Sequence, residues 1–194
     1  MIAFLRGDVA DLKPTELVLD VGGVGYHLHI PFSTFEKIKD LENTALFVHT
    51  HHREDSFKLF GFASAEERSL FRVLLGIAGI GPAVALSILS GLSIGDFVAA
   101  VRDKNPLPLM KVPGIGKAKA EKIIFELQRR LKKLETLSFG APAASSVRAD
   151  ALEALGSLGF DEKKSSSVVD SLLADNPGIA LEALIRHSLK AFSE

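Results

Sequence analysis

The sequence of 194 residues contains no cysteine. Disulfide bonds and thiolate metal sites are therefore excluded, and the composition fits a reducing compartment. The motif G-x-x-x-x-G-K-[ST], whose amides and lysine hold nucleotide phosphates, is also absent, so we expect no ATP hydrolysis by this chain. Arg6 and Asp8 interrupt what would be the apolar core of a signal peptide, so we predict no secretory segment and a cytoplasmic location.

Long unbroken hydrophobic runs are missing as well. The segment from Leu74 to Gly95 has no charged residue over 22 positions, which is long enough for a membrane span. It contains five glycines, three serines and Pro82, however, and a backbone broken in this way is not tolerated facing lipid. We therefore interpret the segment as a buried helical hairpin and predict no membrane association.

Charge is distributed unevenly along the chain. Residues 65–137 carry 12 basic and 7 acidic side chains, whereas residues 1–64 carry 6 and 9, and residues 138–194 carry 5 and 8. Only the middle region therefore has the excess of positive charge that attracts polyanions.

The same middle region contains an internal repeat. The stretch FRVLLGIAGIGPAVALSIL is matched 35 residues later, around LPLMKVPGIGKAKAEKII, with Gly79 aligned on Gly114. Matched positions keep either identity or apolar character, and a Gly-Ile-Gly falls within the frame of each copy.

A Gly-Ile-Gly turn before a helix has a chemical use. The glycines permit close approach and leave amide N–H groups exposed at the start of the helix, where the helix dipole is positive. Such a turn can bind one phosphate, and two copies can bind two. The alternative is a plain helical turn with glycine as a C-cap. The duplication and the local positive charge favour phosphate binding, which reads no base sequence and weakens with salt.

The first third of the chain has the pattern of strands. TELVLDVGGVGYHLHI alternates apolar and polar residues on either side of a Gly22-Gly23 turn, and NTALFVHTHHREDSFKLFGF repeats the pattern around residues 53–56. Short strands with hairpin turns indicate a small barrel or sandwich. GGVGYH is not a nucleotide loop, because alternation rather than an amphipathic helix follows it.

Helices are predicted after residue 63. The capping signals are Ser64 with Glu67, Ser93 with Asp96, and the pair Asn105-Pro106. Residues 137–146 lose periodicity and gain small residues, as a flexible linker does. A separate module follows, with helices predicted to begin near Val147, at Asp161 and at Asn176-Pro177. We thus expect domains at 1–64, 65–136 and 147–194, the last a small three-helix bundle.

Two longer stretches resemble a known family. GIAGIGPAVALSIL and KVPGIGKAKAEKII are similar to the paired helix-hairpin-helix motifs of the RuvA family, and the likeness extends to MIAFLRGDV, GGVGYHLHIP, REDSFKLFGF and the C-terminal module. The resemblance implies a multidomain α+β protein. Its parts would be an N-terminal five-stranded OB-like β-barrel, a central all-α double helix-hairpin-helix domain and a C-terminal three-helix bundle similar to ubiquitin-associated domains.

The resemblance also implies a function. The family binds four-way (Holliday) junction DNA by structure and not by sequence, holds it open and planar as a homotetramer or a pair of tetramers, and recruits a RuvB-type hexameric ATPase for branch migration. A RuvC-type resolvase would be a further partner, in recombination, DNA repair and the SOS response to DNA damage. The chain itself would be non-catalytic and without a cofactor, since ATP and magnesium would be used by the motor.

Carried over by position, the phosphate contacts lie in the two turns. The resemblance assigns them to the amides of Gly79, Ile80, Gly81, Gly114, Ile115 and Gly116, with Lys117 and Lys119 as charged neighbours. Family members often carry a lysine near Ala83, whereas this first copy has no basic side chain between Arg72 and Arg102. We therefore expect the first site to rely on amides and dipole. Lys111 and Lys122 would add to the positive field, although the cluster from Lys122 to Lys133 also fits a solvated helix face.

Glu54 and Asp55 match the acidic pin that the family places at the junction centre. Four copies would repel phosphates near the tetramer axis, over a range that salt limits to roughly 8–10 Å. They are alternatively polar residues at a hairpin tip, or a metal-binding nuclease pair. Adjacent strand residues point to opposite faces, and no third carboxylate has a recognisable spacing, so a shared metal is disfavoured.

Two further groups of residues have alternative interpretations. His49, His51 and His52, beside His27 and His29, could suggest a zinc site, since His49 and His51 would share a strand face. Without cysteine or a clear carboxylate partner we favour strand-surface residues. In the C-terminal module an apolar stripe is our candidate for docking the motor, although most of it could equally be core. Its residues are Leu155, Leu158, Phe160 and Leu172.

Two rival functions stay open at this point. One is a helix-hairpin-helix nuclease or glycosylase that uses Glu54, Asp55 or another carboxylate. The other is a generic DNA-binding scaffold without preference for junctions. Metal-dependent cleavage would indicate the first, and equal affinity for linear duplex and junction would indicate the second.

Overall fold

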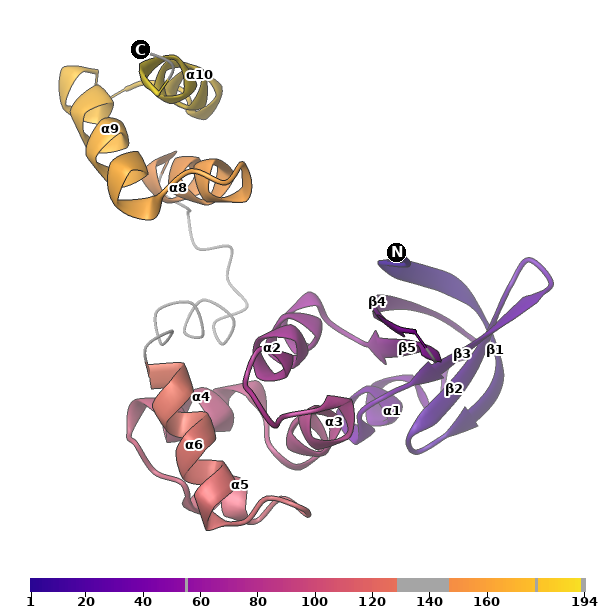
Figure 1. Ribbon diagram of the computed structural model, residues 1–194. Helices are drawn as coiled ribbons and strands as arrows, with labels where there is room; N and C mark the ends of the chain where they lie inside the picture. The colour runs from indigo at the N-terminus through magenta and orange to yellow at the C-terminus, as the bar shows by residue number, and fades with distance from the viewer. Residues whose placement is uncertain (55, 129–146, 177, 193–194) are drawn as a thin grey trace. The chain divides into compact units, whose positions relative to one another are not determined.

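The computed structural model describes residues 1–54, 56–128, 147–176 and 178–192. Asp55 and the linker predicted at 137–146 lie outside the described residues. The chain divides into two compact units, Met1–Gly140 and Ala141–Glu194. The predicted barrel and central helical regions therefore belong to one unit (Figure 1).

Five strands close a barrel at the start of the chain. They are β1 (Phe4–Lys13), β2 (Glu16–Val21), β3 (Val24–His29), β4 (Asn43–Arg53) and β5 (Ser56–Phe62), in the order β1-β2-β3-β5-β4. The β3–β5 pair is parallel and the others are antiparallel. Val21 pairs with Val24 across Gly22 and Gly23, whose φ angles of 64° and 88° suit a two-residue hairpin turn. The prediction of a small barrel is confirmed, and a sandwich is not formed.

A short helix, α1 (Phe32–Ile38), connects β3 to β4. The sequence analysis missed it, because seven residues give too few turns for a clear helical period. Ile38 is buried in the barrel core with Leu17, Leu28 and Leu46. The helix thus covers one end of the barrel and belongs to its core.

The described residues that follow the barrel in the first unit form five helices. They are α2 (Ala65–Leu75), α3 (Pro82–Gly91), α4 (Ile94–Arg102), α5 (Leu107–Met110) and α6 (Lys117–Gln128). Ser64 and Ser93 cap α2 and α4 as predicted, since each side-chain oxygen accepts a hydrogen bond from the amide three residues later, at 3.2 and 3.0 Å. Asn105 Oδ1 accepts from the Leu107 amide at 3.1 Å, and the helix begins just after Pro106.

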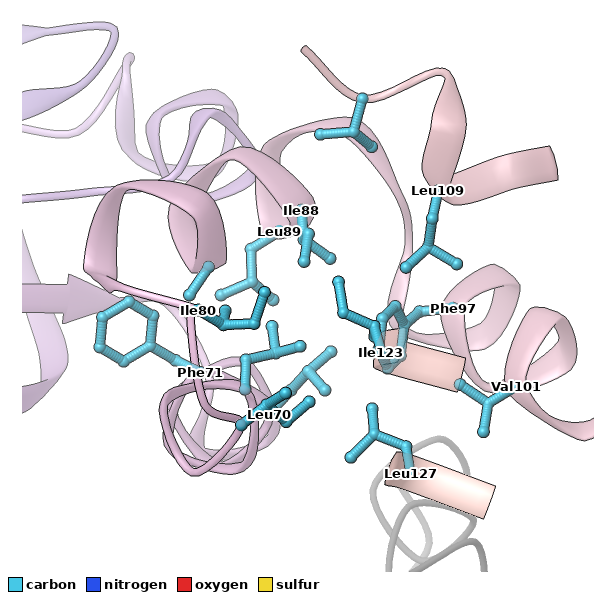
Figure 2. Close-up of a cluster of buried hydrophobic side chains, with 14 of the residues drawn as sticks. Leu70, Phe71, Ile80, Ile88, Leu89, Phe97, Val101, Leu109, Ile123 and Leu127 are labelled. Carbon is cyan, nitrogen blue, oxygen red and sulfur yellow. The ribbon is translucent and has the colours of Figure 1, made fainter. Parts of the chain in front are cut away.

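One hydrophobic core joins these helices to the barrel. Figure 2 shows Ile80, Ile88, Phe97 and Ile123 pointing toward one another from different segments. The ring of Phe71 in α2 lies 5.0 Å from Phe60 and 4.9 Å from Phe62, both in β5. Because the two regions share buried aromatic rings, the barrel and the double hairpin have a fixed relation to each other.

A buried carboxylate strengthens the same junction. Glu67 in α2 is 4% exposed and accepts hydrogen bonds from Thr34 Oγ1, Lys37 Nζ and the Ala63 amide at 3.0–3.1 Å. Its carboxylate therefore bonds to the amide of residue 63, and not to that of Ser64 as the predicted capping box requires. A buried carboxylate with three donors is well satisfied, and it links α1 to the start of α2.

Among the described residues, no single helix is long and apolar enough to cross a membrane. The pair α3 and α4 reaches the necessary length and composition together, but the two helices bend by 101°. Both contribute buried residues to the shared core, among them Ile88 and Phe97. The hydrophobic segment of the sequence is thus a buried helical hairpin, as predicted.

The described residues of the second unit form three helices, α8 (Val147–Ser157), α9 (Glu162–Asp175) and α10 (Leu181–Ala191). Asp161 caps α9 as predicted, since its Oδ1 accepts from the Lys164 amide at 3.0 Å. The predicted start of the third helix at Asn176-Pro177 is wrong. Asn176 instead ends α9, with its amide donating to the Leu172 carbonyl, and α10 starts only after the buried Ile179.

Candidate nucleic-acid interface

The two copies of the repeat have the same backbone, hydrogen bond by hydrogen bond. Gly79 and Gly114 have φ angles of 89° and 82°, in the left-handed region that favours glycine. In each turn the amide of the isoleucine donates to the carbonyl three residues earlier. At the start of each helix an amide donates to the carbonyl of the second glycine. These bonds are Ile80 N to Ile77 O (3.0 Å), Ile115 N to Val112 O (3.1 Å), Ala85 N to Gly81 O (3.1 Å) and Ala120 N to Gly116 O (3.0 Å).

The isoleucines hold the turns in place. Ile80 and Ile115 are 5% and 4% exposed, and Figure 2 shows Ile80 pointing into the core. Their amides donate within the turns, so neither is free for a ligand in this conformation. The sequence analysis placed phosphate contacts on all three amides of each turn, and the geometry narrows this set to the glycines.

The glycine amides face open space. Within the described chain, the N–H groups of Gly79, Gly81, Gly114 and Gly116 have no hydrogen-bond acceptor. A Cβ placed on Gly81, Gly114 or Gly116 would have no neighbour within 4 Å. Each pair lies directly before a helix of at least ten residues, where the dipole favours an anion. Each turn can therefore accept one phosphate from solvent.

The predicted lysines belong to the second turn. Lys119 Nζ donates to the Gly114 carbonyl at 3.1 Å, which holds its ammonium beside that turn. Lys117 is exposed and lies 3.9 Å from Glu121, a weak surface ion pair. At the first turn the structure brings a lysine that sequence spacing could not assign there. Lys122 Nζ, from α6, donates to the Ala78 carbonyl at 2.6 Å.

A cleft of about 320 Å³ lies beside the first turn. Its lining includes Arg53 and Lys58 from the barrel and Pro82 and Ala83 from the start of α3. Arg53 Nε donates a hydrogen bond to His51 Nε2 at 3.0 Å. The barrel therefore adds basic side chains next to the first hairpin, which carries none of its own between residues 72 and 102.

The strand histidines divide into two groups. His27 and His52 are exposed, as predicted, whereas His29 and His49 are partly buried against Phe60. Burial is the main cause that lowers the pKa of His29, and the neighbouring His27 adds to it. Burial likewise lowers the pKa of His49, followed by the positive charge of Arg72. Within the described residues, no three histidine or carboxylate side chains are grouped so as to hold a metal ion.

Glu54 lies at the exposed tip of the β4–β5 hairpin. Arg53 pairs with Ser56 in the last pair of the hairpin, and Glu54 follows this pair directly. This is a hairpin tip in the same compact unit as the two phosphate turns. Asp55, the other predicted pin residue, is outside the described residues.

The predicted docking residues of the C-terminal unit do not form one exposed stripe. Leu155 is fully buried, and Leu172 packs against the core at its edge. Phe160 stacks on Phe192 with ring centroids 4.5 Å apart. Leu158 is 59% exposed and is therefore the accessible member of the set.

A closed five-stranded barrel that shares its core with two matched helix-hairpin-helix turns defines a double helix-hairpin-helix protein. Family models match over nearly the whole chain: the RuvA N-terminal domain at residues 1–61, a SAM-like helix-hairpin-helix tandem at 71–129 and the RuvA C-terminal domain at 146–193.

Three relatives that match nearly the whole chain are each named Holliday junction branch migration complex subunit RuvA. The relative from Syntrophotalea carbinolica is 41% identical over 194 residues, covering 98% of both chains. That from Methylibium petroleiphilum is 41% identical over 192 residues, covering 96% of this chain and 100% of its own. That from Pseudomonas putida KT2440 is 41% identical over 202 residues, covering 98% of both. The chain belongs to the RuvA family.

Proposed function

We propose that this chain is a non-catalytic DNA-binding subunit that binds Holliday junctions for branch migration, in recombination and repair. The observation that carries the proposal is the pair of turns with the same φ angle and the same hydrogen bonds, held in one compact unit with the barrel. The full-length match to relatives named for this role supports it.

The contacts explain why recognition is by structure. Glycine amides and lysine ammonium groups bind phosphates, which every base sequence presents alike. The two turns of one chain would bind two phosphates, and selection would come from how several chains place their turns around the crossover. Binding of this kind weakens as salt rises, because each phosphate contact releases counterions.

The assembly that fits this role is a homotetramer, or a pair of tetramers, with one chain for each arm. A junction has four arms, and a closed ring of four identical subunits gives each arm the same surface. In such a ring the exposed Glu54, with Asp55, would repel backbone phosphates where the arms separate. Screening limits this repulsion to roughly 8–10 Å, so the pin must lie beside the crossover.

The work of branch migration belongs to another chain in this proposal. A RuvB-type hexameric ATPase would use ATP and magnesium, while this chain needs no cofactor, and a RuvC-type resolvase would act on the same junction. The C-terminal unit is the adaptor, with the exposed Leu158 as its most accessible apolar contact for the motor.

The decisive experiment is a gel-shift titration of an immobile four-way junction against a linear duplex with the same arm sequences, with and without magnesium. We expect tight binding to the junction, competition by duplex only at large excess, and uncut strands. Equal affinity for both DNAs would contradict junction selectivity. Magnesium-dependent cleavage would contradict the non-catalytic role and return Glu54 to the candidate catalytic residues.

A second measurement tests the motor. A mobile junction is incubated with ATP, a RuvB-type ATPase from a relative and this chain. Branch migration should require all three, and Leu158→Asp should reduce it while junction affinity is unchanged. Because Leu158 is largely exposed, this change leaves the core of the bundle intact.

A further inference from the structure

The first hairpin lacks a cation of its own. Lys119, the third residue of α6, is matched in the first copy by Val84, the third residue of α3, and Val84 packs against the shared core. Lys117 is matched by Pro82, which has neither a charge nor an N–H group. A phosphate at the first turn would therefore meet fewer donors and less charge than one at the second.

Lys122 reaches this turn from the other copy of the repeat. Its Nζ lies 2.6 Å from the Ala78 carbonyl oxygen, 44 residues earlier in the chain. It also lies 4.0 Å from where a Cβ on Gly79 would be, and no other described heavy atom outside Gly79 and its chain neighbours lies within that distance. The missing side chain of Gly79 is what lets a phosphate approach, so the ammonium stands at the entrance to the first site.

Each turn thus has a lysine bonded to one of its carbonyl groups, but the lysine comes from the same hairpin in one case and from the other hairpin in the other. Lys119 Nζ donates to the Gly114 carbonyl within its own hairpin, and Lys122 Nζ donates to the carbonyl before Gly79 across the hairpins. An ammonium group has three donors, so Lys122 retains two after this bond. No carboxylate among the described residues pairs with Lys122, and its charge is available to a ligand.

We propose that Lys122, from α6 of the second copy, is the phosphate-binding cation of the first hairpin. The first copy itself has no basic residue at the start of α3, where Ala83 and Val84 lie. This inference rests on the proposed function, since it assigns a residue to one of its two phosphate sites. Lys122 belongs to the second copy by sequence and to the first site by position. One helix, α6, therefore provides a lysine to each turn, in addition to Arg53 and Lys58 of the barrel in the cleft beside the first.

The test separates this role from a structural one. Lys122→Gln keeps a donor for the Ala78 carbonyl and removes the charge, and Lys119→Gln is the matched change at the second turn. Each variant is titrated with the junction and with linear duplex over a range of salt concentrations, and each is also melted. For Lys122→Gln we expect about fivefold weaker binding to both DNAs at low salt, and a salt slope smaller by roughly 0.9, the value for one phosphate contact.

Rescue identifies the site. Ala83 is exposed at the start of α3, so Ala83→Lys places a cation at the first turn directly. It should restore the affinity and salt slope of Lys122→Gln and leave those of Lys119→Gln largely unrestored. Equal rescue of both variants would overturn the assignment, because any added charge would then suffice. So would a Lys122→Gln variant that melts at a lower temperature but keeps the wild-type salt slope.

The outcomes also distinguish this inference from the proposed function. The ratio of junction to duplex affinity in the wild-type chain reports junction selectivity. The change in slope on removing Lys122, measured on either DNA, reports the cation. The two results are independent. Even if the chain bound junction and duplex equally, the change in salt slope on removing Lys122 would still show whether this lysine binds a phosphate.

Discussion

The two hairpins have the same backbone and different side chains. Both have a glycine with φ above 80° and the same turn and helix-start bonds, although the aligned segments IAGIGP (77–82) and VPGIGK (112–117) share only the three residues Gly-Ile-Gly. The first has an apolar α3 that is buried on one side, and the second has a lysine-rich α6. The comparison shows that the turn geometry is kept where the side chains differ, and that a lysine beside a turn can come from elsewhere in the fold.

The largest effect should follow from breaking that shared geometry. Gly114→Val places a branched side chain at φ 82°, which costs on the order of 1–2 kcal/mol, and its side chain blocks the approach of a phosphate. We expect junction affinity to fall by more than about tenfold for all base sequences alike, measured by gel shift. Gly79→Val should do the same at the first turn.

Gly114→Asn is the control for this pair, because asparagine tolerates the left-handed region. Gly114→Asn adds a side chain with little backbone strain, so its loss of affinity measures obstruction of the phosphate alone. The further loss in Gly114→Val measures strain in the turn. Should Gly114→Val fold normally and become selective for particular base sequences, the model of backbone contacts would be refuted.

The next effect has the opposite sign and concerns the hairpin tip. Glu54→Gln with Asp55→Asn removes negative charge that repels phosphates, so junction affinity should stay the same or rise, by up to about threefold. Branch migration with a RuvB-type motor should change in rate in the same variant. A large loss of affinity would instead mean that these residues hold the fold or bind DNA directly.

Much of this molecule can be predicted from its sequence where the signal is local. The hairpin at Gly22-Gly23, the caps at Ser64, Ser93 and Asp161, and the repeated turns are all set by a few adjacent residues. The barrel follows from alternation, since each strand keeps one apolar face. Such features need no knowledge of distant contacts.

The parts that could not be predicted depend on contacts across the chain. The charge at the first hairpin comes from Lys122, 44 residues away from its partner Ala78, and no spacing rule assigns it there. The burial of His49 depends on the docking of Phe71 in α2. Asn176-Pro177 has the pattern of a helix start, but the buried Ile179 holds the turn between helices and delays α10. Tertiary packing decided each of these.

A smaller effect should come from making the first hairpin resemble the second. Pro82→Ala restores an N–H at the first position of α3, where the second copy has Lys117. One more amide facing the phosphate should raise affinity by about twofold, while the loss of proline costs less than roughly 1 kcal/mol of stability. The reciprocal change, Lys117→Pro, should weaken binding. If both changes leave affinity untouched, the first-turn amides of these helices do not contact DNA.

The smallest effect concerns pH, and it should be confined to the barrel side of the first hairpin. His29 and His49 lie there, and the second hairpin, residues 107–128, contains no histidine. Burial lowers the pKa of both rings below the ordinary value of 6.5. As pH falls below 6.5 the unfolded chain therefore takes up protons that the folded chain does not, and the free energy of unfolding decreases.

The decrease between pH 7.0 and 5.5 should be below about 1 kcal/mol, because both rings remain partly exposed and solvent screens their charge. Urea unfolding at the two pH values measures it, and His49→Gln, which is neutral throughout, should show a smaller difference than the wild-type chain. His52→Gln is the matched control, since His52 is exposed, and it should leave the difference unchanged. An identical pH dependence in His49→Gln and the wild-type chain would mean that the titrating groups lie elsewhere. The contact between the barrel and the first hairpin would then be no more sensitive to pH than the second hairpin.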